Sequence, residues 1–182
     1  MNTEKNIKQI IENLGEDVNR EGLIKTPLRY SKALKDLTSG YNINIMDEIK
    51  DGIFSSNNNN IITIKNIEFY SLCEHHLLPF FGKISICYIP NNKILGLSKF
   101  TRISDMYSKR LQIQERLTEQ ICDKIMEILE PKGVAIFIEA SHLCMMMRGI
   151  CKQNSTTITT CFSGIFNLDE NLKNEFYNII KN

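Results

Sequence analysis

The segment Ile62-Thr63-Ile64-Lys65-Asn66-Ile67-Glu68-Phe69 alternates apolar and polar residues, and the alternation slips once between Ile64 and Ile67. A period of two residues is typical of a strand with one buried face, and a single slip is what a β-bulge produces. A second alternating segment follows and ends at Pro90-Asn91-Asn92; its apolar positions are Ile84, Ile86 and Tyr88. The two segments predict a pair of strands, of which the first is bulged.

Helices are predicted on the N-terminal side of this pair. The first has apolar residues at Ile7, Ile10, Ile11 and Leu14, with Thr3 as N-cap and Gly15 as its end. Thr26-Pro27 predicts the N-cap and first position of a second helix, which Gly40 ends, and a short helix is expected near 45–50. The polar run 55–60 then divides an N-terminal helical region, 1–55, from a catalytic region, 61–182, within one functional domain.

Two helices, two strands and a last helix are predicted after the strand pair. Ser98 or Thr101 would cap a helix through Tyr107, and a longer helix over 117–128 stops before Pro131. Segments 134–139 and 156–166 are rich in strand-forming residues, and 172–179 has helical periodicity. The order β-β-α-α-β-β predicts the α+β class with an antiparallel sheet, because a doubly wound fold would alternate strands and helices strictly.

Composition excludes several classes of function. The chain has 182 residues, with 22 Lys and Arg against 21 Asp and Glu, a net charge of +1. This balance lacks the overall basic charge of nucleic-acid binders. No apolar run approaches the roughly 18–20 residues of a membrane span, and the first residues lack the apolar core of a signal peptide. We therefore expect a cytoplasmic protein without nucleic-acid or membrane partners, whose six cysteines are reduced.

The three histidines all lie within three residues of a cysteine. Cys73-Glu74-His75-His76 places a thiol and an imidazole three residues apart, and His142 and Cys144 would point to the same side of an extended strand. Zinc accepts both donor types. Three ligands, Cys73, His76 and Cys144, would leave a fourth position for water, as catalytic zinc requires. Adding His142 would instead close a structural site, and the spacing alone leaves both readings open.

Other polar residues have weaker signals. Ser98, Lys99 and Arg102 fall within one helical turn and could receive a phosphate, although a solvated surface turn has the same pattern. Arg148 is a further cation near the metal candidates. The Gln114-Glu115 pair offers a carboxylate that could accept two hydrogen bonds from a guanine edge. The remaining cysteines are interpreted mainly as packing residues: Cys87, Cys122, Cys151 and Cys161.

Several long stretches together make the sequence similar to the GTP cyclohydrolase I family. They run over 21–29, 71–80, 96–99, 112–118 and 142–149, in the family's order, and they contain CEHH, QERLT and HxCxxxRG. The resemblance implies a zinc enzyme that opens the guanine imidazole ring of GTP and forms 7,8-dihydroneopterin triphosphate and formate. This reaction is the first step of tetrahydrofolate and pterin biosynthesis. Whether folate or biopterin is the end product stays open.

The resemblance also implies roles for individual residues. Cys73, His76 and Cys144 would bind Zn²⁺, and His75, His142 and Ser98 would be catalytic. His75 would protonate an imidazole nitrogen of guanine, His142 would be a second acid or base, and Ser98 would lie near the ribose. Substrate would be bound by the guanine-holding pair Gln114 and Glu115 and by the triphosphate-binding cations Lys99, Arg102, Arg148 and Arg29, the last from a neighbouring subunit.

The resemblance further implies a tunnelling fold: an antiparallel four-stranded sheet backed by two helices, with an N-terminal helical extension and a C-terminal helix. The family forms a homodecamer of two pentamers with sites between subunits. Two alternative functions fit parts of the same sequence. Other tunnelling-fold enzymes use three histidines around zinc or a nucleophilic cysteine, which the CEHH segment disfavours. A zinc-binding scaffold without catalysis would have little use for His75, His142 and Glu115.

Overall fold

The structure is a computed structural model that describes residues 3–181. Contacts between residues group the chain into two units that divide between Ser39 and Gly40. The predicted division into an N-terminal helical region, 1–55, and a catalytic region, 61–182, stays a prediction. Among the described residues, no helix is both long and apolar enough to cross a membrane.

The first unit is a pair of helices. They are α1 (Thr3–Asn13) and α2 (Thr26–Leu37). Its small core consists of Ile7, Ile11 and Val18, against which Leu23 and Leu34 pack. The helices are confirmed, but the predicted cap of α2 is wrong: Lys25 is the N-cap and Thr26 is already helical, with its hydroxyl donating to the Gly22 carbonyl.

The second unit contains the sheet. Its elements are α3 (Ile45–Ile49), β1 (Ile53–Ser55), β2 (Ile62–Cys73), β3 (Pro79–Ile89), β4 (Lys93–Leu95), α4 (Leu97–Ser108), β5 (Leu111–Gln112), α5 (Gln114–Leu129), β6 (Gly133–His142), α6 (Leu143–Met146), β7 (Thr157–Gly164) and α7 (Glu170–Lys181), with short 3₁₀ turns at Ser39–Asn42, Lys50–Gly52 and Ile165–Asn167. The predicted β-β-α-α-β-β order is confirmed by β2, β3, α4, α5, β6 and β7.

The sheet has the strand order β5-β2-β3-β6-β7. The four long strands pair antiparallel, as predicted, and the two-residue β5 adds a parallel edge to β2. The bulge is confirmed: the β2–β3 register shifts between Ile64 and Ile67, and Asn66 has a φ of 59° there. The β1–β4 ribbon was not predicted.

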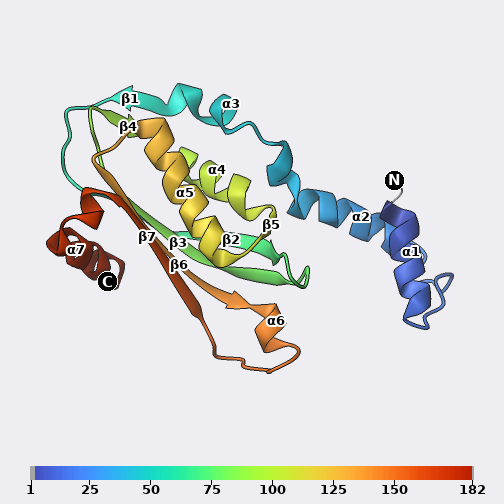
Figure 1. Ribbon diagram of the computed structural model, residues 1–182. Helices are drawn as coiled ribbons and strands as arrows, with labels where there is room; N and C mark the ends of the chain where they lie inside the picture. The colour runs from blue at the N-terminus through green and yellow to red at the C-terminus, as the bar shows by residue number, and fades with distance from the viewer. Residues whose placement is uncertain (1–2, 182) are drawn as a thin grey trace. The chain divides into compact units, whose positions relative to one another are not determined.

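The main core lies between the sheet and two helices. Figure 1 shows α4 and α5 side by side over one face of the sheet, with α4 against β2 and α5 against β6 and β7. Residues such as Ile84, Ile138 and Leu117 are fully buried between these layers. At one end of the opposite face, α7 covers a second cluster around Cys87, Phe166 and Phe176. A sheet held from both sides in this way fixes the strand ends that carry the polar residues.

The N-cap of α4 differs from the prediction. Gly96 is the N-cap and no side chain caps the helix, so neither Ser98 nor Thr101 has that function. The helix is instead anchored by burial of Phe100 and Ile103, which are fully inaccessible. No two of the six cysteines form a disulfide in the structure.

Candidate active site

A tight turn between β2 and β3 presents the first two metal candidates. Cys73 is the last residue of β2, and its carbonyl accepts from the backbone N–H groups of His76 at 3.3 Å and Leu77 at 2.8 Å. Leu77 has a φ of 54°, a left-handed conformation that reverses the chain before Pro79 opens β3. The turn brings the Cys73 Sγ to 4.0 Å from the His76 Nδ1.

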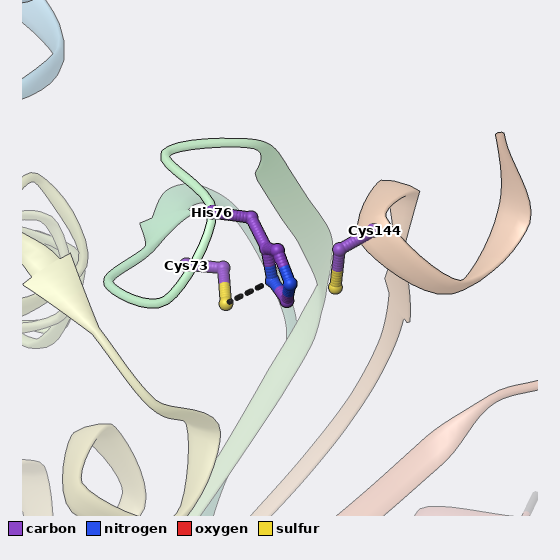
Figure 2. Close-up of side chains that lie close together, drawn as sticks. All are labelled: Cys73, His76 and Cys144. Carbon is purple, nitrogen blue, oxygen red and sulfur yellow. Dashed lines mark hydrogen bonds between the residues drawn. The ribbon is translucent and has the colours of Figure 1, made fainter. Parts of the chain in front are cut away.

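Cys144 reaches the same place from another segment. The ligand atoms of Cys73, His76 and Cys144 all lie within 4.8 Å of one another, and Figure 2 shows the three side chains converging from two segments. The predicted strand geometry for Cys144 is wrong, because β6 ends at His142 and Cys144 lies in the short helix α6. The helical turn, and not strand alternation, directs this thiol to the other two.

The chemistry of the donor set fits a divalent metal ion. Two thiols and one imidazole are ligands that suit Zn²⁺ and related ions. Burial raises the pKa of the Cys144 thiol, and the neighbouring Cys73 raises it further, whereas Arg148 lowers it slightly. Two adjacent thiolates repel each other, and a bound cation removes that repulsion by ligating both.

A cavity of about 230 Å³ opens beside the three ligand atoms. It is lined by Cys73, His75, His76, Gln112, Ile113, Gln114, Glu115, His142, Cys144, Met145 and Thr157. The structure therefore brings the metal candidates together with both spare histidines and the Gln114-Glu115 pair. His75 is exposed in this cavity, with its Nδ1 3.9 Å from the Cys73 Sγ.

His142 is held more firmly than His75. Its ring stacks on Phe80, with 4.7 Å between centroids and an interplanar angle of 2°. Its Nε2 lies 2.8 Å from the Gln114 Oε1. Burial lowers the pKa of His142, and the negative charge of Glu115 opposes this shift. The neutral imidazole is therefore favoured near pH 7.

The first two residues of α5 have different environments. Gln114 is 2% exposed and its amide is fully engaged within the protein. Glu115 is exposed at the cavity, and no hydrogen bond or ion pair joins its carboxylate to another described residue. Glu115 thus has free acceptor atoms for a ligand, whereas the Gln114 side chain does not.

The expected phosphate-binding residues do not line this cavity. Lys99 donates to the Glu48 carbonyl at 2.7 Å, and Arg102 forms an ion pair with the Glu48 carboxylate at 2.6 Å. Arg102 lies on the second turn of α4 and Lys99 on the first turn, close after β4, and Figure 1 shows β1 and β4 at the opposite end of the sheet from α6. Ser98 is exposed on the first turn.

Two further predicted cations have separate positions. Arg148 is exposed just after α6, in the segment that carries Cys144. Arg29 is exposed on α2, in the first unit. Neither lines the cavity beside the metal candidates.

Sequence reasoning missed Phe80 as a residue of the site. It is fully buried, and its position opposite His142 in the β3–β6 register makes the ring stacking. Its place at the start of β3, seven residues after Cys73, was visible in the sequence. The strand register that pairs it with His142 was not.

Comparisons with known proteins agree on one family. The family model described as GTP cyclohydrolase I matches residues 3–181. Proteins named GTP cyclohydrolase 1 are similar over most of their length in Campylobacter jejuni (strain RM1221), at 53% identity over 96% of this chain and 92% of the relative, and in Leptospira biflexa, at 50% identity over 96% of each. The protein of that name from Saccharomyces cerevisiae is 55% identical over 88% of this chain and 66% of its own length.

Proposed function

The chain belongs to the GTP cyclohydrolase I family, and we propose that the cavity beside Cys73, His76 and Cys144 is the site where it converts GTP to 7,8-dihydroneopterin triphosphate and formate. The activity follows from relatives of that name that are about half identical over nearly the full chain. One observation carries the assignment of the site: three metal-binding side chains, two further histidines and a free carboxylate line one cavity.

Zn²⁺ is the metal we assign to the three ligands. Two thiolates and an imidazole match its preferred donors, and three protein ligands leave one coordination position open. When bound, zinc would act as a Lewis acid that lowers the pKa of a water molecule to about 7, so that a nucleophile is available at neutral pH.

The two spare histidines supply proton transfer. Opening the imidazole ring of guanine needs a proton on a ring nitrogen when C8 is attacked, and His75 is the exposed imidazole of the cavity that the metal-binding group does not use. His142, stacked and hydrogen-bonded, serves as the second acid or base in the later proton steps. The two histidines therefore divide proton transfer between an exposed imidazole and one that is fixed by its neighbours.

Glu115 is assigned to the guanine base. Its carboxylate is free, it lines the cavity, and it can accept two parallel hydrogen bonds from the ring N–H and the exocyclic amino group of guanine. Adenine presents no such pair of donors. The carboxylate thus gives the site a physical reason to select GTP.

The triphosphate requires cations that the cavity of one chain does not contain. We assign Lys99, Arg102, Arg148 and Arg29 to it, and Ser98 to the ribose. Lys99 and Arg102 lie at the other end of the sheet from α6, so they would serve the site of a neighbouring subunit rather than their own. The site would then be shared between subunits.

Self-association has independent support in the first unit. This small helical pair leaves large apolar side chains exposed, namely Ile10, Leu14, Ile24, Leu28, Tyr30 and Leu37. Apolar surface of this kind is typical of interfaces between proteins. We propose a homodecamer of two pentamers in the cytoplasm.

The test is formate and pterin formation from GTP by the purified, assembled protein, with and without a zinc chelator. We expect one formate per GTP and a pterin that fluoresces after oxidation, both lost on chelation and restored by zinc. A zinc-loaded assembly that releases no formate would support a scaffold without catalysis instead.

A His75→Ala variant makes the same test residue-specific. We expect it to keep its zinc, because His75 is not a ligand, and to lose formate release by about 100-fold or more, as when a general acid is removed. Full formate release by this variant would move the proton donor elsewhere.

A further inference from the structure

A buried hydrogen-bond network behind the cavity connects His142 to Gln114 and to the backbone of two strands. The network begins where the His142 Nε2 meets the Gln114 Oε1 at 2.8 Å. The two residues of this hydrogen bond come from distant segments, since His142 is the last residue of β6 and Gln114 is the first residue of α5. Because a histidine ring nitrogen can donate or accept, the direction of this bond must come from the surroundings of Gln114.

The orientation of the Gln114 amide is fixed by backbone carbonyl groups. Its Nε2 lies 2.9 Å from the Thr157 carbonyl oxygen and 3.2 Å from that of Ile138. Carbonyl oxygens only accept hydrogen bonds, so the amide nitrogen must face them. A flipped amide would set its oxygen against two carbonyl oxygens in a site that is 2% exposed, which is strongly unfavourable.

Two threonines support the same orientation. Thr118 donates its hydroxyl hydrogen to the Gln114 main-chain carbonyl at 2.7 Å, and its oxygen lies 2.7 Å from the Thr159 hydroxyl. Since Thr118 has only one hydrogen to donate, Thr159 must donate to Thr118. The Thr159 oxygen then presents a lone pair to the Gln114 Nε2, 3.1 Å away.

The direction of the last bond follows from the others. The Gln114 Oε1 is a carbonyl oxygen and accepts, so the His142 Nε2 must carry a hydrogen. A neutral imidazole has a single N–H, which leaves Nδ1 as its acceptor atom, and no described residue hydrogen-bonds that nitrogen. Stacking on Phe80 opposes the half-turn of the ring about Cβ–Cγ that would replace Nε2 with the carbon Cε1 beside Gln114.

We propose that Gln114 is a positioning residue that holds His142 protonated at Nε2, so that His142 exchanges protons with the substrate only through Nδ1. Its side chain does not bind the substrate, in contrast to the expectation from the resemblance. The consequence for catalysis rests on the proposed function, whereas the position of the hydrogen does not.

The position of the hydrogen is measured directly by nitrogen-15 NMR of the zinc-loaded protein, labelled only in its histidine rings. The chain has three histidines, so His75→Ala and His142→Ala spectra assign the signals. We expect the His142 Nε2 to give the shift of a protonated ring nitrogen and Nδ1 that of an unprotonated one. The reverse assignment would overturn the proposal whether or not the protein turns over GTP.

The role of Gln114 is tested by Gln114→Met, with Gln120→Met as the matched control on the same helix. Met has similar length but cannot fix the ring hydrogen. We expect the single His142 tautomer to be lost, kcat to fall about 10–100-fold, as for other residues that orient a functional histidine, and KM for GTP to stay within about threefold. Gln120→Met should keep the tautomer and kcat.

Two results would contradict this role. A KM that rises with kcat unchanged would mean that Gln114 binds the substrate, and an unchanged tautomer in Gln114→Met would mean that another group sets it. Thr159→Val provides a milder variant, because the two backbone carbonyls still hold the amide. We expect it to retain the tautomer and to lose less than about threefold in kcat.

Discussion

Cys144 provides the strongest test of the metal site at the scale of one residue. Removing one of two thiolate ligands leaves Cys73 and His76, too few to hold zinc firmly. We expect Cys144→Ala to lose its zinc, measured by elemental analysis after dialysis, together with all turnover. Cys151→Ala is the matched control, because Cys151 is exposed and its thiol has only the Gly149 carbonyl as a hydrogen-bond partner among the described residues. Turnover by metal-free Cys144→Ala would refute a metal-dependent reaction.

Glu115 permits a separate test of base recognition. Losing a charge-assisted pair of hydrogen bonds costs about 1.5–3 kcal/mol, or about 10–100-fold in affinity. We expect Glu115→Ala to abolish the preference for GTP over inosine triphosphate, which lacks the amino group, while inhibition by inorganic triphosphate changes little. Glu119→Ala, one turn further on the same helix and also exposed, should keep the preference. A preserved preference in Glu115→Ala would remove that residue from the guanine site.

The candidate residues were predictable where the chemistry is local. Cys73 and His76 lie in one turn, so their spacing alone suggested a shared ligand. Cys144 was paired with them for a wrong reason, because a short helix was not visible in the pattern after His142. The engagement of Gln114 depends on backbone carbonyls of β6 and β7, whose register a single sequence does not give.

The bulge in β2 is the element whose sequence signal was clearest. Ile62 and Ile64 pack toward the main core, and so do Ile67 and Phe69, although the two pairs differ in parity along the strand. An extra residue is needed to keep all four on one face, and Asn66 provides it in a left-handed conformation. Cys73 lies further along this strand, so the bulge also sets which face the ligand occupies.

Asn66 therefore has a predictable effect on stability. A β-branched residue in the left-handed region costs about 1–2 kcal/mol, whereas glycine adopts it freely. We expect Asn66→Val to lower the free energy of unfolding by about 1–2 kcal/mol, measured by denaturant titration, and Asn66→Gly to change it by less than about half of that. Asn66 is exposed, so lost packing does not complicate the comparison. Equal stability of the two variants would mean that the bulge relocates.

The long elements were predictable because their patterns are long. The periodicity of α5 extends over 117–128, and the alternation at Ile84, Ile86 and Tyr88 in β3 follows that of β2. Four short elements were not predicted: β1, β4, β5 and α6. Each has four residues or fewer, which is too short for a repeating pattern of apolar residues to be recognised. Their formation depends on pairing with distant segments. The tunnelling-fold arrangement of one antiparallel sheet and two covering helices was nevertheless correct.

At the scale of the whole molecule, the distribution of charges raises the question of assembly. A triphosphate carries about four negative charges, and the cavity beside the metal ligands is lined by no lysine or arginine among the described residues. Arg102 forms an ion pair with Glu48 at the other end of the sheet, and each of the two side chains is about half exposed. Exposed pairs of this kind contribute little to stability, so exchanging Glu48 for a phosphate costs little.

Subunit complementation tests whether sites are shared. His75→Ala and Arg102→Ala should each be inactive alone. When they are co-expressed in equal amounts, a site built from His75 of one chain and Arg102 of a neighbour has both residues intact with a probability of about one quarter, so about 25% of wild-type formate release should return.

The matched control is His75→Ala with Cys144→Ala: both residues lie in the cavity of one chain, so mixing them should restore no activity. Native mass spectrometry of differently tagged chains confirms that mixed assemblies form. Mixed assemblies of the first pair that stay inactive would mean that each chain supplies its own phosphate-binding residues, and Arg102 would then have to leave Glu48 and reach the cavity of its own chain.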